Sequence, residues 1–329
     1  SATALTSCKN GGGNRMQDEP ATGKMTYREN PETHSRVGLL GYGMRHLPTV
    51  GQSGADGEKQ QSDDETIDQN RVNRLVDYAL SHGVNYFDTA PVYSNGQSER
   101  ATGMALKRHK RSSYLLASKM SNMRTFTKEA STAMFNSSLK VLQTRYIDYY
   151  ALDAIGIDDD ERDAMELFQA RFIDNGVLDF LLQKRKEGTI RNLGFSFQGD
   201  QEVFDHALSM HDTGRVHWDF AQIEMNYLSW NHAHELKADK VNASYLYAEL
   251  QKRGIPVIIM NPLLGGKLAD LPNPVMAKLK QRAPEHSAAS WTLRYCGSFK
   301  GVLTVLSNMI FMEHLKDNLR SFCPLEPLS

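Results

Sequence analysis

The stretch Asn85-Tyr-Phe-Asp-Thr-Ala-Pro-Val-Tyr-Ser-Asn-Gly-Gln-Ser-Glu99 decides the fold of this chain. It begins with a short apolar run, which predicts a buried strand. Asp88 stands at the end of that strand, and Tyr93 follows in a loop rich in turn-forming residues. An acid and a phenol at the carboxyl end of a parallel strand lie where a barrel of strands and helices places its reactive groups.

Outward from this stretch, short apolar runs alternate with longer amphipathic segments. Eight strands are predicted, at Val37–Leu40, Tyr86–Phe87, Tyr114–Ala117, Ile147–Leu152, Asn192–Phe195, Phe220–Ile223, Val257–Met260 and Val302–Leu306. Helical periodicity predicts helices at Ile67–His82, Lys128–Leu142, Val177–Glu187, Glu202–Met210 and Ala243–Arg253. Apolar strands that alternate with helices predict a parallel sheet covered on both faces. Eight units predict an α/β fold, a single-domain (β/α)8 TIM barrel, and a doubly wound open sheet is the alternative.

Composition excludes several functional classes. The 38 basic and 39 acidic residues nearly cancel, so no nucleic-acid partner is expected. No apolar run is long enough to span a bilayer. Three cysteines, Cys8, Cys296 and Cys323, are too few for a disulfide framework or a cysteine-rich zinc site. His232 and His234 have a metal-like spacing but no third ligand nearby, so no metal site is predicted.

Residues 1–34 are predicted to form a flexible tether, and residues 35–329 the barrel. Leu5-Thr-Ser-Cys8 resembles a bacterial lipobox, and a polar, glycine-rich stretch follows it. Two interpretations stay open. In one, Cys8 carries a lipid and the protein lies at the bacterial cell envelope; in the other, an ordinary disordered N-terminus precedes a cytoplasmic barrel.

Three residues fall at the carboxyl ends of successive predicted strands: Asp88, Lys119 and Asp153. A lysine beside the Tyr93 phenol would stabilise phenolate and lower the tyrosine pKa, and an acid beside that lysine would keep it charged. Tyr93 could then act as a general acid that protonates a carbonyl oxygen as hydride reaches the carbon. The alternative is a structural Asp–Lys pair with an unrelated surface tyrosine, and spacing alone slightly favours this alternative.

Several further motifs occur in a fixed order along the chain. With the opening stretch, these motifs resemble the aldo-keto reductase family between about Arg36 and Phe322: Leu115-Leu-Ala-Ser-Lys-Met120, Tyr146-Ile-Asp-Tyr-Tyr150, Asn192-Leu-Gly-Phe-Ser196, Gln222-Ile-Glu-Met-Asn226, Pro262-Leu-Leu-Gly-Gly-Lys267 and His314-Leu-Lys-Asp-Asn318. The resemblance is greatest to a bacterial subgroup that often continues into a ferredoxin-like C-terminal segment. It implies a (β/α)8 barrel and an oxidoreductase that reduces small aldehydes, ketones or conjugated enones with NAD(P)H.

The resemblance also implies roles for individual residues. Tyr93 is the expected proton donor, Lys119 the neighbour that lowers its pKa, and Asp88 the partner of the lysine. NADP(H) is expected ahead of NAD(H), although His314 stands where many members place an arginine near the 2′-phosphate. The expected cofactor-binding residues are Ser196, Gln222, Met260, Pro262, Leu263, Gly265, Gly266, Lys267, Ser307, His314, Asp317 and Asn318.

The main departure from the family pattern is Asp153, which stands where most members have a histidine that orients the substrate carbonyl. An ionised Asp153 would oppose a developing alkoxide, whereas a protonated one could donate a hydrogen bond to the carbonyl. A third possibility is a catalytically weak or inactive barrel that binds the nucleotide and has a regulatory role. Among other residues, Trp230 is the one expected to contact substrate.

Overall fold

Eight parallel strands close into a barrel in the order β10–β3–β4–β5–β6–β7–β8–β9. The computed structural model describes residues 19–52, 62–263, 273–282 and 286–328. The barrel strands are β3 (Leu40–Gly43), β4 (Tyr86–Asp88), β5 (Leu115–Met120), β6 (Ile147–Ile155), β7 (Ile190–Phe197), β8 (Phe220–Glu224), β9 (Val257–Met260) and β10 (Val302–Asn308). The predicted TIM barrel is confirmed, and the doubly wound alternative is excluded because the sheet is closed.

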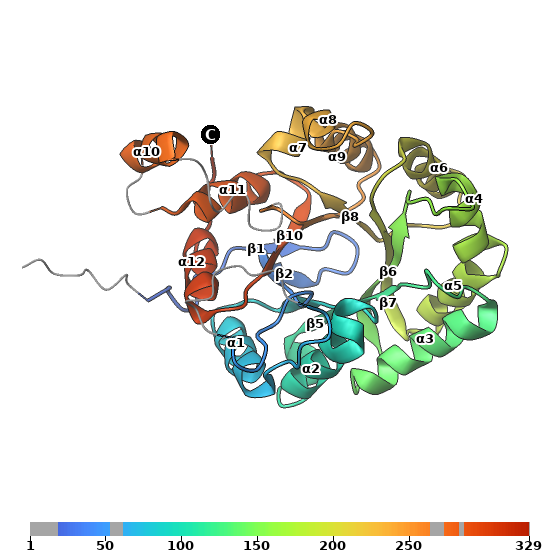
Figure 1. Ribbon diagram of the computed structural model, residues 1–329, viewed down its shortest axis with the longest axis horizontal. Helices are drawn as coiled ribbons and strands as arrows, with labels where there is room; N and C mark the ends of the chain where they lie inside the picture. The colour runs from blue at the N-terminus through green and yellow to red at the C-terminus, as the bar shows by residue number, and fades with distance from the viewer. Residues whose placement is uncertain (1–18, 53–61, 264–272, 283–285, 329) are drawn as a thin grey trace, which may run out of the picture.

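Helices surround the barrel and follow one another around it (Figure 1). They are α1 (Gln69–Ser81), α2 (Gln97–Leu106), α3 (Lys128–Val141), α4 (Ala164–Phe168), α5 (Val177–Glu187), α6 (Gln201–Asp212), α7 (Tyr227–Asn231), α8 (Ala233–Leu236), α9 (Ala243–Lys252), α10 (Asn273–Arg282), α11 (Ala288–Gly297) and α12 (Met312–Phe322). Sequence explains the first of them directly. The Asp68 carboxylate accepts from the Arg71 amide and caps α1, and Val72, Leu75 and Val76 turn one face of the helix into the core.

The first strand was predicted in the wrong place. Val37 belongs to β2 (Arg36–Gly38), which pairs antiparallel with β1 (Tyr27–Glu29) in a separate hairpin. The first barrel strand is β3, between β4 and β10. Both runs are apolar and only Leu39 separates them, so periodicity alone merged two strands of different sheets.

Packed structure also begins before residue 35, the predicted start of the barrel. Met25 is buried, and the Thr26 amide donates to the Phe322 carbonyl at 2.8 Å. In the hairpin turn, the Asn30 side-chain amide donates to the Tyr149 hydroxyl at 2.9 Å. The segment from 25 to 34 is therefore part of the folded unit rather than of a tether. Residues 1–18, with Cys8, lie outside the described part.

Aromatic side chains pack against one another inside the barrel. The Tyr149 ring lies 5.2 Å from both the Tyr86 ring and the Phe220 ring, measured between centroids. All three side chains are buried, so the barrel is a packed core and its reactive groups are confined to the carboxyl end of the strands. Within the described ranges, no helix is long and apolar enough to cross a membrane.

Candidate active site

A buried ion pair joins two neighbouring barrel strands. The Lys119 ammonium on β5 donates to both carboxylate oxygens of Asp88 on β4, at 2.7 Å each, and to the Thr89 carbonyl at 2.9 Å. Lys119 is 1% exposed and Asp88 is 4% exposed. Burial alone would lower the pKa of Lys119, but the attraction of Asp88 outweighs it and raises the pKa above its ordinary value. Lys119 is therefore cationic at neutral pH.

Tyr93 lies beside this pair, as predicted. Its ring centroid is 5.0 Å from the Lys119 Nζ, and the residue opens the short helix η2 (Tyr93–Gly96) that follows β4. Burial raises the pKa of Tyr93 to about 12. The positive charge of Lys119 favours the phenolate, but the effect of burial is larger. The expected net lowering by Lys119 is thus not found. Tyr93 is a neutral phenol at ordinary pH and can serve as a proton donor.

Asp153 on β6 faces the same cluster. Its Oδ1 accepts from the Ser196 hydroxyl at 2.7 Å, and its Oδ2 accepts from the Ser121 hydroxyl at 3.1 Å. The Asp153 charge acts on both Tyr93 and Lys119, where it raises each pKa. The structure therefore brings together all four residues that the sequence singled out for chemistry.

Two residues predicted to hold the nicotinamide amide also lie next to each other. Ser196 on β7 pairs in register with Gln222 on β8. Gln222 is 2% exposed, and its side-chain amide donates at 3.6 Å to the Met260 sulfur, a weak acceptor. The same side chain also forms a hydrogen bond with the Asp88 carboxylate. Its amide group has both donors and an acceptor, which suits a planar carboxamide ligand. Pro262 is buried and Leu263 packs against the core, whereas Gly265, Gly266 and Lys267 lie outside the described residues.

The residues predicted for the adenosine end gather around the N-terminal half of α12. The Asn318 amide donates to the Ser307 hydroxyl at 2.7 Å, and Asp317 accepts from the Ser287 hydroxyl at 2.7 Å. His314 is exposed, at the wall of a pocket of about 480 Å³ between α1 and the start of α12. The pocket is lined by Arg71, Arg74, Leu75, Ile310, Phe311, Met312, Glu313 and His314.

Two arginines of that pocket were not predicted. Arg71 lies over the Phe311 ring, with 5.6 Å from its guanidinium carbon to the ring centroid, and Arg74 is exposed one turn further along α1. Phe311 gives α12 no side-chain cap, so the first amides of that helix are open to an anion. This arrangement depends on the closed barrel, which places α1 beside α12, so the sequence pattern alone could not predict it.

Arg171 is a third residue that sequence reasoning missed. Its guanidinium is buried and donates to the Asp153 carbonyl, to the Ala154 carbonyl at 3.0 Å and to the Asn122 carbonyl at 3.4 Å. Arg171 thereby ties together the backbone that follows β5 and the end of β6. A single arginine in an amphipathic segment gives no sequence signal for such a role.

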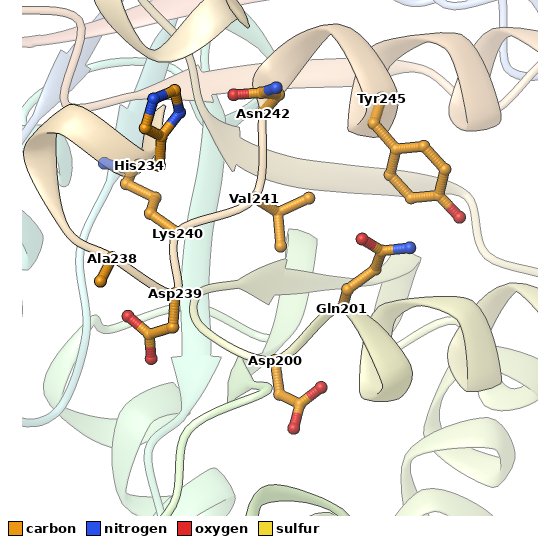
Figure 2. Close-up of a pocket in the computed structure, with 9 residues that line it drawn as sticks. All are labelled: Asp200, Gln201, His234, Ala238, Asp239, Lys240, Val241, Asn242 and Tyr245. Carbon is orange, nitrogen blue, oxygen red and sulfur yellow. The ribbon is translucent and has the colours of Figure 1, made fainter. Parts of the chain in front are cut away.

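A second pocket, of about 550 Å³, lies between the start of α6 and the segment that joins α8 to α9 (Figure 2). Among the predicted residues only His234, from the doubtful metal pair, lines it. The His232 and His234 rings are 6.4 Å apart, and His232 pairs instead with Glu235 at 3.3 Å. The Trp230 ring packs 4.7 Å from Phe299 in an aromatic cluster, and its contact with substrate stays a prediction.

Comparison with known proteins agrees with this geometry. The model of the aldo/keto reductase family matches residues 51–328, and the chain belongs to that family. An uncharacterized oxidoreductase, YqkF of Bacillus subtilis, is 29% identical over 142 residues, and the aldo-keto reductase YhdN of the same organism is 42% identical over 81 residues. These matches span 40% and 24% of the two relatives, and 39% and 22% of this chain.

Solved structures show the same fold. The aldo-keto reductase AKR11C1 from Bacillus halodurans, in its holo form, superposes with a TM-score of 0.65 at 23% identity and 93% coverage of both chains. An aldo/keto reductase from Klebsiella pneumoniae in complex with NADP and acetate superposes with a TM-score of 0.63 at 20% identity. That match covers 90% of this chain and 89% of the other.

Proposed function

We propose that this protein is an NAD(P)H-dependent reductase of small molecules in which Tyr93 is the general acid. The observation that carries the proposal is the cluster of Tyr93 with the buried Lys119–Asp88 pair at the carboxyl end of the strands. Family membership supplies the reaction type, since its members act on carbonyl compounds.

Different residues of the chain would bind the cofactor, donate the proton and stabilise the charge that develops. A bound reduced nicotinamide would supply the hydride. Ser196, Gln222 and Met260 would hold its carboxamide end, and the packed barrel below excludes water from it. Tyr93 would give its proton to the substrate oxygen, and the fixed positive charge of Lys119 would stabilise the phenolate left behind.

The same proposal favours NADP(H) as the cofactor. His314, Arg71 and Arg74 surround the pocket at the open end of α12, which suits the charge of a 2′-phosphate. The solved Klebsiella pneumoniae relatives bind NADP or NADPH. Arg74→Ala should weaken binding of NADPH several-fold and leave NADH binding unchanged, as measured by quenching of protein fluorescence. Equal effects on both nucleotides would contradict a phosphate contact.

Tyr93→Phe tests the role of the phenol. The variant keeps the ring and loses the hydroxyl group that carries the proton, so NADPH should bind as before while carbonyl reduction falls roughly 10²–10⁴-fold. Rates are followed by NADPH absorbance. Unchanged carbonyl reduction by Tyr93→Phe would mean that another group donates the proton.

One observation favours a second candidate, a barrel that binds the nucleotide without efficient turnover. A carboxylate at Asp153 disfavours both the alkoxide and the tyrosinate, and the pKa of Tyr93 is already raised to about 12. Binding of NADPH without oxidation on any substrate would be its signature.

A further inference from the structure

Two oppositely charged side chains at the active-site mouth form no ion pair with any described residue. The Asp153 carboxylate accepts hydrogen bonds from two serine hydroxyls. Arg45 is exposed, and it lies near the Tyr93 ring, 5.5 Å from guanidinium carbon to ring centroid. The Lys119–Asp88 pair, by contrast, is internally neutral. The charges that remain for a substrate are therefore one negative and one positive, both beside Tyr93.

The side chain of Asp153 is placed as a hydrogen-bond acceptor. Both of its oxygens accept hydrogen bonds from hydroxyl donors, which is the arrangement a carboxylate needs. The nearby guanidinium of Arg171 donates to the backbone carbonyls of Asp153, Ala154 and Asn122 rather than to the Asp153 carboxylate.

An acidic side chain that accepts hydrogen bonds at this position suits a cationic carbon–nitrogen double bond better than a ketone. Hydride addition to a ketone creates an alkoxide beside the carboxylate, whereas addition to an iminium ion removes a charge and creates no anion. Neutral imines are poor hydride acceptors, and a carboxylate next to the nitrogen raises the imine pKa so that the protonated form prevails. The hydride step then requires no proton, and the neutral amine that forms takes up one proton afterwards, from Tyr93 or from water.

We propose that the substrate of this site is an imino acid, with its iminium nitrogen on Asp153 and its carboxylate on Arg45. The proposal rests on the reductase function proposed above and names its substrate class. The hydride of the reduced nicotinamide adds with its electron pair to the iminium carbon. The π electrons of the C=N bond move to nitrogen, and the products are an amino acid and the oxidised nicotinamide.

Binding tests this assignment without the cofactor. Once its amine has taken up a proton, the amino acid product has the same two charges as the substrate, so proline serves as the probe in calorimetric titrations of the whole protein. Proline methyl ester, which lacks the negative charge, and cyclopentanecarboxylate, which lacks the positive one, are the matched ligands. Proline should bind at least about tenfold more tightly than either, because each lacks one charge pair at a partly desolvated site.

Two variants assign the two charges. Asp153→Asn should reduce proline affinity about tenfold and leave cyclopentanecarboxylate binding unchanged or improved. Arg45→Met should also reduce proline affinity about tenfold, but should leave binding of proline methyl ester unchanged or improved. Arg145→Met, at an exposed position before β6, is the control and should change neither. Equal binding of all three ligands by the wild type would overturn the proposal, and that result needs no variant to fold.

Measurements of turnover distinguish the imino-acid assignment from the broader proposal that the protein is a reductase. With NADPH, the wild type should reduce the cyclic imino acid at least about tenfold faster, in kcat/KM, than the matching 2-oxo acid and simple aldehydes. Faster reduction of the oxo acid would overturn the imino-acid assignment and leave the reductase intact. Binding of proline without NADPH oxidation on any substrate would instead overturn the reductase function and leave the charge recognition standing.

Discussion

At the scale of single residues, Asp153 decides which substrates the site can serve. Its carboxylate lies beside Tyr93 and Lys119, where it opposes any oxyanion that forms on a substrate. Asp153→His removes that charge and adds a hydrogen-bond donor, so reduction of simple aldehydes should rise roughly tenfold or more. The measurement is kcat/KM with NADPH at neutral pH, and Arg145→Met is the control. No gain in Asp153→His would show that the carboxylate is not what limits carbonyl reduction.

The Lys119–Asp88 pair makes a separate prediction about stability. Lys119→Met leaves Asp88 as a buried carboxylate without a counter-charge, so the free energy of unfolding should fall by about 3–5 kcal/mol. Urea denaturation measures the free energy of unfolding of the variant and of the wild type. The double variant Lys119→Met/Asp88→Asn removes both charges and should recover part of the loss. A single variant as stable as the wild type would mean that water reaches Asp88.

At the scale of elements, Arg171 joins the ends of two strands. Arg171→Leu strips the hydrogen bonds from the carbonyls of Asn122, Asp153 and Ala154, and each buried unpaired group costs about 1–3 kcal/mol. The variant should therefore lose at least that much stability and bind NADPH less tightly, because Asp153 and its partner Ser196 shift. Arg145→Leu, on the exposed surface, should stay within about 0.5 kcal/mol of the wild type. Equal stability of both variants would contradict the role given to Arg171.

Sequence predicted most elements but misplaced those whose partners lie far along the chain. The alternation of apolar and amphipathic runs located seven of the eight barrel strands, because their burial on both faces leaves an apolar run. The prediction of the eighth strand, at Val37–Leu40, was wrong. Only the pairing of β2 with β1 shows that this segment begins in a hairpin and not in the barrel. Local periodicity contains no information on such pairing.

Prediction of the candidate active site from sequence has the same limit. Asp88, Tyr93, Lys119 and Asp153 could be found because each follows or ends a recognisable strand. Arg45, Arg71, Arg74 and Arg171 could not, since their roles depend on which helix or loop the closed barrel sets beside them. The packing of the Trp230 ring against Tyr247 and Phe299 could not be predicted either, because these residues lie far along the chain.

At the scale of the whole molecule, buried tyrosines predict how stability responds to alkali. Burial raises the pKa of Tyr42, Tyr86, Tyr149 and Tyr150 above the ordinary value of 10.0. Below that value the folded and unfolded chains both keep these protons. Above it only the unfolded chain loses them, so the free energy of unfolding should fall steadily as pH rises beyond 10.0.

Urea denaturation across this pH range, read by circular dichroism, checks the slope, and near-ultraviolet tyrosinate absorbance reports the ionisation. The buried tyrosines should titrate only together with unfolding. Titration of all of them at the ordinary value while the fold persists would contradict the burial of these rings.

The central claim is that this barrel transfers hydride from a nicotinamide cofactor at a site built on Tyr93, Lys119 and Asp88. The most direct test titrates NADPH into the protein and then follows NADPH oxidation with a panel of aldehydes, ketones, enones and imino acids. Saturable binding, followed by oxidation on at least one substrate class that Lys119→Met cannot sustain, is the predicted result. Tight binding of NADPH with no oxidation on any member of the panel would contradict the claim.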